Sequence, residues 1–276
     1  MNIRIFPSVA RGEISAPPSK RMAHRALICA ALAQGESRIV NVSHCEDVQA
    51  TLDCLQALGA KCQMNHDEVI IQGADFSQSA TATLPCRESG STMRFLLPLC
   101  LLSGSPNTLI GAPTLLNRPM EPYQALCREH GLYFEQTEQG ITVKGPLAAG
   151  EYTLAGDVSS QFISGMLFAL TQVEGESILH ILSPFESRSY VLLTLQMLTF
   201  FGADVVCLDD NTLRIRGGKP LSAKEYTVEG DYSGAAFLSA LNILGGKVTV
   251  QGLNPASLQG DRIYFEHFKT LQNGFA

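Results

Sequence analysis

The sequence lacks the patterns that mark several common chemistries. Its 276 residues contain no tryptophan, and its formal net charge of −6 differs from the basic charge typical of nucleic-acid-binding proteins. No two cysteines are spaced as CxxC and no two histidines as HxxxH or HExxH, so we expect no metal site. The nucleotide-binding patterns GxxxxGK[ST] and GxGxxG and the nucleophile elbow GxSxG are also missing, which leaves those enzyme classes without support.

Long hydrophobic runs are missing too. The strongest, Phe95 to Leu102, is too short to cross a bilayer and contains Pro98. The first residues, MNIRIFPSVARGEI, alternate like a strand and lack the apolar core of a signal peptide. The eight cysteines are scattered, and several, such as Cys29 and Cys54, fall in apolar helical stretches where a thiol packs as a small hydrophobe. We therefore expect a cytoplasmic protein with reduced cysteines and no membrane or nucleic-acid partner.

A repeat of about seventy residues runs through the chain. Four similar strand-like segments begin at residues 37, 107, 177 and 247, at intervals of 70. Each is followed by an amphipathic helix that ends at a glycine suited to the left-handed C′ position, namely Gly59, Gly131, Gly202 and Gly274. Two short strands come next in each of the first three units, and one strand of each pair lies at 69–72, 141–144 and 213–216, respectively. A strand and a second helix lead into each seventy-residue mark, and those helices are predicted to begin near Ser19, Ser91, Ser160 and Ser233.

The repeat predicts an α/β fold of β-α-β-α-β-β units in two lobes. Residues 14–226 hold three complete units and form one lobe, while residues 1–13 and 227–276 pair to form an incomplete second lobe, with a hinge near Ile14 and Thr227. The fourth unit stops after Gly274, before its last two strands, so we expect that a C-terminal portion is missing and that exposed apolar surface favours association. The alternative is a natural domain that a partner chain completes.

The four leading helices are opened by segments 17–25, 88–94, 157–161 and 231–234, and the first two of these segments carry cationic residues. A helix N-terminus attracts anions, so Lys20, Arg25 and Arg94 oppose the helix dipole there, at a cost of about 0.3–1 kcal/mol each when exposed. Arg118 precedes another predicted helix start, with Pro119 near its first position. Any one of these residues is also explained as a solvated surface cation. Their repetition in successive units predicts a site for a small phosphorylated acid.

Six motifs occur in the order PPSK–xxxHRAL, ESGSTMRF, LLNRPM, GDVSSQF, ESRSY and LQGD, from about Ile14 to about Gly274. In this the chain resembles the EPSP synthase family of enolpyruvyl transferases. The resemblance implies two lobes of three repeats each, with helix N-termini facing the cleft between them. It also implies transfer of enolpyruvyl from phosphoenolpyruvate to the 5-hydroxyl of shikimate-3-phosphate in the shikimate pathway, without metal or organic cofactor, by an enzyme that is monomeric at full length.

The resemblance assigns roles to individual residues. Contacts with phosphoenolpyruvate are implied for Lys20, Gly90 and Arg118, and contacts with shikimate-3-phosphate for Arg25, Tyr190, Ser159, Ser160 and Ser187. Gln161 would lie beside both substrates, and Arg94 would support the second loop. Two residues depart from the family's usual pattern. Arg21 stands where the family usually has serine, so it either adds a contact to a phosphate or obstructs the ligand. Glu88 stands where many members have asparagine. His24 is either a ligand contact or a structural histidine.

The family's acid–base residues are expected beyond the position of Ala276. We therefore expect no catalytic residue within this chain and no transferase activity from it alone. Two other functions compete with this one. The first is a non-catalytic module that binds phosphorylated metabolites. The second is UDP-N-acetylglucosamine enolpyruvyl transferase, which shares the fold but usually carries a Lys-Asn pair in the first loop and a reactive cysteine, neither of which is recognisable here.

Overall fold

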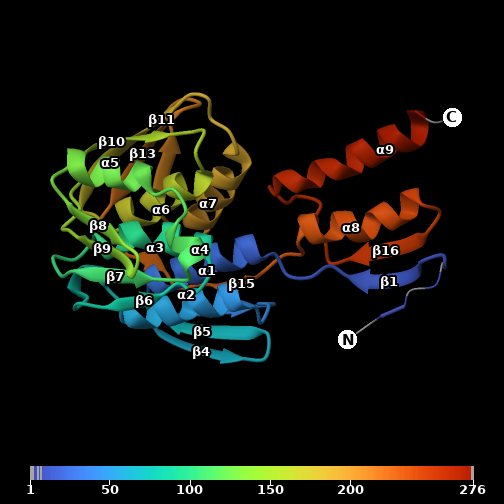
Figure 1. The fold of residues 1–276 in the computed structure, drawn as a ribbon, viewed down its shortest axis with the longest axis horizontal. Helices are drawn as coiled ribbons and strands as arrows, with labels where there is room; N and C mark the ends of the chain where they lie inside the picture. The colour runs from blue at the N-terminus through green and yellow to red at the C-terminus, as the bar shows by residue number, and fades with distance from the viewer. Residues whose placement is uncertain (1–2, 5, 7, 275–276) are drawn as a thin grey trace. The chain divides into compact units, whose positions relative to one another are not determined.

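Three four-stranded sheets of the same connectivity form the framework of the segment Arg21–Val228 (Figure 1). The first contains β15 (Glu225–Thr227), β3 (Glu36–Val40), β5 (Glu68–Gln72) and β4 (Lys61–Asn65). The second contains β6 (Thr83–Pro85), β7 (Asn107–Ile110), β9 (Gly140–Lys144) and β8 (Tyr133–Thr137). The third contains β10 (Glu151–Ala155), β11 (Gly175–Leu182), β13 (Thr212–Gly217) and β12 (Asp204–Cys207). In each sheet the first two strands are parallel and the other pairs are antiparallel.

The computed structural model describes residues 3–4, 6 and 8–274. The chain divides into two compact units: a larger unit, Arg21–Val228, and a smaller unit, Met1–Lys20 with Glu229–Ala276. None of the helices formed by the described residues is long and apolar enough to span a membrane. All eight cysteines are free thiols.

Three central helices provide most of the core of the larger unit. They are α1 (Lys20–Leu32), α3 (Gly90–Cys100) and α6 (Ser160–Leu170). Eleven of the thirteen residues of α1 are buried, as are nine of eleven in α3 and ten of eleven in α6. Burying one large apolar side chain stabilises the fold by about 1.5–3 kcal/mol, so these helices contribute strongly to stability.

The other helices of this unit are α2 (Glu46–Ala57), α4 (Pro113–Leu116), α5 (Glu121–Glu129) and α7 (Arg188–Phe200). The unit also contains a 3₁₀ turn at Phe76–Gln78. A short parallel pair joins β2 (Ala33–Gln34) to β14 (Leu221–Ser222).

A glycine allows α6 to lie close against α3. A Cβ atom at Gly165 would lie 2.2 Å from the hydroxyl oxygen of Tyr123 and 2.4 Å from the carbonyl oxygen of Arg94. The Tyr123 hydroxyl shares its one hydrogen between the carbonyl oxygens of Arg94 at 2.7 Å and Phe162 at 2.9 Å, which ties the first turns of the two helices together. Any larger residue at position 165 would push these helix starts apart.

The predicted helix ends are confirmed at three glycines. Gly59, Gly131 and Gly202 follow α2, α5 and α7 with φ angles of +110°, +67° and +93°. Gly274 is the last described residue of α9 (Tyr264–Gly274), so its role at a helix end stays a prediction.

The four leading helices begin within one residue of the predicted positions, at Lys20, Gly90, Ser160 and Tyr232, but several N-caps are other residues than expected. The N-cap of α3 is Ser89 rather than Ser91, because the Ser89 hydroxyl accepts from the backbone N–H of Thr92. The N-cap of α8 (Tyr232–Ile243) is Asp231 rather than Ser233, because its carboxylate accepts from the N–H of Gly234.

The N-cap of α6 and the position of Pro119 also differ from the prediction. The N-cap of α6 is Ser159, so Ser160 is its first helical residue. Pro119 is not at the first position of a helix, since α5 starts at Glu121 with Pro122 inside its first turn.

The smaller unit pairs the two ends of the described chain. Strand β1 (Arg11–Ser15) is parallel to β16 (Lys247–Gln251), and Figure 1 shows α8 lying along this pair. The segments that lead out of this unit are hydrogen-bonded to one another, from Ser19 N to Glu229 O at 2.8 Å and from Asp231 N to Pro17 O at 2.7 Å. A 3₁₀ turn at Gly260–Ile263 precedes α9.

Gln259 of the LQGD motif is a structural residue of the smaller unit. Its amide oxygen accepts from the Ser19 hydroxyl and from Tyr232 N, and its amide nitrogen donates to the Glu229 carboxylate at 2.7 Å and to Gly230 O at 2.9 Å. This side chain is only 3% exposed, so its full set of partners meets the requirement of a buried amide. Gln259 thereby fixes the start of α8.

Candidate functional site

The starts of α3 and α6 meet through Arg94 and Gln161. The Arg94 guanidinium donates to Gln161 Oε1 at 2.9 Å and to Pro119 O at 3.4 Å, and it lies 5.0 Å from the centre of the Phe162 ring. Gln161 Nε2 donates to the hydroxyl of Ser91 at 2.8 Å. Arg94 therefore links the start of α3 to Gln161 and to Pro119, and the supporting role that the resemblance implies for it stays a prediction.

Gly90, the first residue of α3, lies against Arg118 from the loop between α4 and α5. A Cβ atom at Gly90 would lie 2.6 Å from Arg118 Nη1, so only glycine leaves the guanidinium in place. Burial, and after it the charge of Arg118, lowers the pKa of Arg94. Two guanidinium groups of like charge thus lie beside a helix N-terminus, an arrangement that favours a bound anion. We call Gly90, Ser91, Arg94, Arg118 and Gln161 the α3 group.

Arg25 is at the centre of a second cluster. Its Nε donates to the hydroxyl of Thr194 at 2.8 Å, and its terminal nitrogens donate to the backbone oxygens of Arg21 and Tyr190, each at 2.9 Å. The Arg21 guanidinium lies 5.0 Å from the centre of the Tyr190 ring. We call Arg21, Arg25, Tyr190 and Thr194 the α1 group.

The charge of Arg25 is poorly compensated. The residue is 3% exposed, and within residues 3–4, 6 and 8–274 no carboxylate forms an ion pair with it. Burial, and after it the positive charge of Arg21, lowers the pKa of Arg25 to about 9. A buried cation that lacks a counter-ion is costly, so a ligand anion close to it would be stabilising. The prediction of a solvated surface cation does not hold for Arg25.

The two groups belong to one packed core. The Arg25 guanidinium lies 5.1 Å from the centre of the Phe95 ring, and Phe95 follows Arg94 in α3. Thr194, which accepts from Arg25, donates to the hydroxyl of Ser164 in α6 at 2.8 Å. The second turns of α1, α3 and α6 are therefore connected through side chains of the larger unit.

The predicted phosphate-binding serines occupy two helix starts. Ser159 is the N-cap of α6 and accepts from Gln161 N at 3.2 Å, while Ser160 begins the helix and is 6% exposed. Ser187 precedes α7 in the left-handed conformation, with φ +55°, and makes no side-chain cap. Such a conformation costs about 1–3 kcal/mol in a residue other than glycine and is frequent at ligand sites.

Lys20 is the first residue of α1 and is exposed. It belongs to the smaller unit, whereas the remainder of α1 belongs to the larger one.

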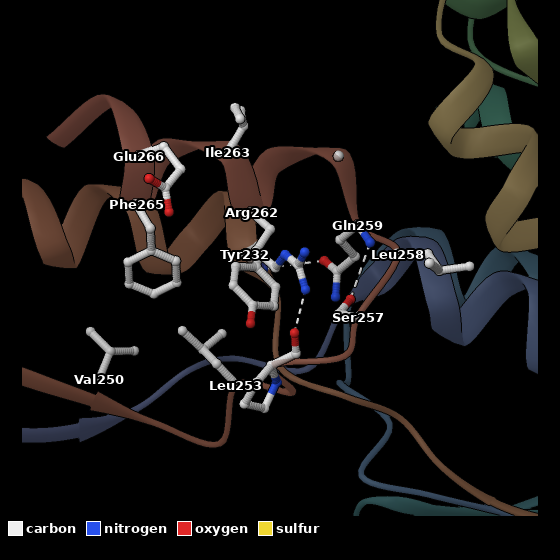
Figure 2. Close-up of a pocket in the computed structure, with 12 residues that line it drawn as sticks. Tyr232, Val250, Leu253, Ser257, Leu258, Gln259, Arg262, Ile263, Phe265 and Glu266 are labelled. Carbon is white, nitrogen blue, oxygen red and sulfur yellow. Dashed lines mark hydrogen bonds between the residues drawn. The ribbon is translucent and has the colours of Figure 1, made fainter. Parts of the chain in front are cut away.

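A cavity of about 600 Å³ lies in the smaller unit (Figure 2). Its walls are largely apolar, with Val250, Leu253 and Phe265 on one side, and Arg262 donates to the carbonyl oxygen of Pro255 within it. None of its described lining residues was predicted as a site residue. No group of three or more His, Cys, Asp or Glu side chains in the described part of the chain could hold a metal ion.

Sequence reasoning missed two members of these groups, Ser91 and Thr194, and also Ser164, which bonds to Thr194. Ser91 was expected only as a cap, yet its hydroxyl accepts from Gln161. Thr194 and Ser164 lie inside apolar helices and carry no motif. Their position one helical turn from Tyr190 and Ser160 was the only available signal.

Comparison with known proteins gives one consistent result. Residues 7–271 match the model of the family described as EPSP synthase (3-phosphoshikimate 1-carboxyvinyltransferase). The chain is 38% identical over 275 residues to the 3-phosphoshikimate 1-carboxyvinyltransferase of Clostridium kluyveri, covering 98% of this chain and 64% of that protein. It is 36% identical over 270 residues to that of Clostridium beijerinckii, covering 95% of this chain and 62% of that protein.

A solved structure agrees with these relatives. The EPSP synthase from Acinetobacter baumannii superposes with a TM-score of 0.77 at 26% identity, covering 94% of this chain and 60% of that one. The chain thus spans a little less than two thirds of the length of the proteins that it matches. The predicted α/β fold class and family resemblance are confirmed, and the chain belongs to the EPSP synthase family.

Proposed function

We propose that this chain carries the substrate-binding lobe of an EPSP synthase, whose complete form transfers enolpyruvyl from phosphoenolpyruvate to the 5-hydroxyl of shikimate-3-phosphate. The observation that carries the proposal is the buried charge of Arg25, which has no carboxylate partner among the described residues and lies in the same core as the α3 group. Both substrates are multiply charged anions, so such a core suits them. The enzyme belongs to aromatic amino-acid biosynthesis.

The two groups divide the substrates between them in this proposal. Lys20, Gly90 and Arg118 hold phosphoenolpyruvate, and Gln161 lies beside both ligands. Arg25 and Tyr190 hold the ring of shikimate-3-phosphate, while Ser159, Ser160 and Ser187 hold its phosphate. A hydrogen bond to a charged partner contributes about 1.5–3 kcal/mol, so a few such contacts suffice for specific binding.

The chemistry adds the 5-hydroxyl oxygen to the central carbon of phosphoenolpyruvate and then eliminates phosphate. The residues of this chain bind and orient the two anions, which makes the reaction effectively intramolecular. The steps also require a general acid and base. We assign no such residue within 1–276, and we propose that the chain alone binds its ligands without turnover.

The lobe boundaries are part of the same proposal. Residues 14–226 form the binding lobe, and residues 1–13 with 227–276 belong to a second lobe. We further propose a cytoplasmic location and, for the full-length enzyme, a monomeric state.

Calorimetry tests the binding proposal. Titration of the purified chain with shikimate-3-phosphate, and then with phosphoenolpyruvate in its presence, should give micromolar binding. Arg25→Met should weaken the first titration, whereas Leu208→Lys, an exposed site outside both groups, should leave it unchanged. UDP-N-acetylglucosamine should release no heat. Binding of that nucleotide sugar, or no binding of either anion, would contradict the proposal, and turnover by the purified chain would contradict the predicted inactivity.

A further inference from the structure

A buried chain of hydrogen bonds runs from α1 through α2 to the start of α3. His24 Nδ1 lies 2.8 Å from Thr51 Oγ1, which lies 2.7 Å from Thr92 Oγ1. Thr92 Oγ1 donates in turn to Ser89 Oγ at 2.7 Å, and Ser89 is the N-cap of α3. All four side chains are at most 2% exposed. A hydrogen-bonded network this deeply buried tolerates no missing member without an energetic penalty.

The direction of donation along this chain follows from counting protons. A threonine hydroxyl has one hydrogen to donate. Both hydroxyls also have a longer contact with Asp47 O, at 3.3 Å from Thr51 and 3.4 Å from Thr92. We place the hydrogen of Thr92 in its shorter bond, to Ser89 at 2.7 Å, so Thr92 accepts from Thr51. Thr51 then uses its own hydrogen on Thr92 and accepts from His24 Nδ1. The shortest bonds of the chain therefore assign a proton to Nδ1 of His24, and they direct every hydroxyl toward the α3 cap.

We propose that Thr51 is a positioning residue for the anion-binding turn at Ser89–Ser91. The proposal rests on the proposed function of that turn. Thr51 is fully buried on α2 and belongs to neither residue group of the candidate site, so it acts through Thr92 and the Ser89 cap. The cap fixes the turn at Gly90, where a displacement of the backbone would alter the contact with Arg118.

Because Thr51 bonds to both His24 and Thr92, substitutions at this position can separate a positioning role from a packing role. Thr51→Val keeps the shape of the side chain but leaves the N–H of His24 without its acceptor and Thr92 without its donor. Thr51→Ser keeps the hydroxyl and loses only a methyl group. A general packing role would make serine the more damaging change, whereas a positioning role makes valine the more damaging one.

The experiment compares these two variants with a matched control, Thr108→Val, which removes one hydroxyl of the Thr108–Thr142 pair between β7 and β9. The first readout is hydrogen–deuterium exchange of the amides at 89–94. The second is the affinity of the full chain for phosphoenolpyruvate with shikimate-3-phosphate present. A cost of about 1.4 kcal/mol corresponds to about tenfold in either readout, and we expect a change of that order for Thr51→Val. In Thr51→Ser and Thr108→Val, both the exchange rates at 89–94 and the phosphoenolpyruvate affinity should stay within about twofold of the wild-type values.

A second variant guards against simple misfolding. His24→Asn offers an amide N–H close to the place of Nδ1–H, so it should retain slow exchange at 89–94, whereas His24→Leu should not. Equal exchange at 89–94 in Thr51→Val and Thr51→Ser would overturn the inference. If the wild type binds neither anion, the proposed function fails instead, and the exchange data still decide whether Thr51 holds the turn.

Discussion

Arg94 of α3 donates to Gln161 of α6 at 2.9 Å, and this bond joins the starts of two central helices. Gln161 returns the contact by donating to Ser91 at 2.8 Å. Ser91 and Gln161 are 70 residues apart, the interval of the sequence repeat, so equivalent positions of successive units touch each other. The site is therefore assembled from corresponding places in the repeat.

Replacement of Gln161 by leucine should weaken both stability and binding. The variant removes the acceptor of the half-buried Arg94 guanidinium, and leaving such a group short of a partner costs about 1–3 kcal/mol. Urea denaturation should show this loss, and calorimetry should show weaker phosphoenolpyruvate binding. Gln49→Leu, which removes the part-buried contact with Asp53, should cost less and leave binding unchanged. Equal losses of stability and of binding in Gln161→Leu and Gln49→Leu would contradict a role for the Arg94–Gln161 hydrogen bond.

Gly90→Ala should separate binding from stability. The new methyl group would lie 2.6 Å from Arg118 Nη1, the far end of a flexible side chain, so the guanidinium moves while the fold remains. Alanine has less conformational freedom than glycine in the unfolded chain, so thermal stability should hold or rise. Phosphoenolpyruvate affinity should fall. Gly104→Ala meets no atom within 4 Å and serves as the control, and unchanged affinity in Gly90→Ala would exclude a role for the Arg118 position.

The lowered pKa of Arg25 predicts a dependence on alkaline pH. Below about 9 the residue is charged in both the folded and the unfolded state, and the cost of burying it is fully present. As the pH rises above about 9 the folded state loses the proton first, so stability should rise relative to Arg25→Met, by at most about 1.4 kcal/mol per pH unit. Unfolding free energies of the wild type and of Arg25→Met, measured from pH 7 to 10, test whether this difference rises.

The same titration predicts the opposite trend for ligand binding. Because shikimate-3-phosphate favours the charged form of Arg25, its affinity should fall over that pH range in the wild type and not in Arg25→Met. A fall of equal size in both proteins would assign the effect to another group.

The apolar surface of α8 predicts self-association. Only Tyr232 and Ala235 of its twelve residues are buried, while Phe237 is 82% and nearby Leu244 is 83% exposed. Light scattering should show concentration-dependent association that decreases in Phe237→Lys/Leu244→Lys, because exposed apolar area favours contact with other molecules. Leu208→Lys on the larger unit should not change it. A monodisperse wild-type monomer would refute this prediction.

Local signals were the predictable part of the structure. The glycines after α2, α5 and α7 were identified because only glycine adopts a positive φ at little cost. Helix starts were less certain, since Ser89 and Ser91, or Asp231 and Ser233, are all capable caps and the tertiary contacts decide between them.

The long-range contacts that form or support the site could not be predicted. Thr51 and Thr92 are separated by 41 residues and Arg25 and Thr194 by 169, and no spacing rule connects such pairs. The burial of Arg25 was hidden for the same reason, because a cation at a helix start is equally well explained as a solvated surface residue. Only the packing of α1 against α3 and α7 removes that guanidinium from water.

The pairing of β15 with β3 has a consequence for folding of the chain during its translation. Glu225–Thr227 supplies the strand that lies parallel to Arg38–Val40, so one side of the earliest sheet is provided by the last segment of the larger unit. A nascent chain on the ribosome would hold β3 with a free edge until that segment emerges, and such edges recruit other strands. Contacts this distant in sequence also slow folding. Translation must therefore pass Val228 before the binding lobe can close, and the edge of β3 needs protection until then.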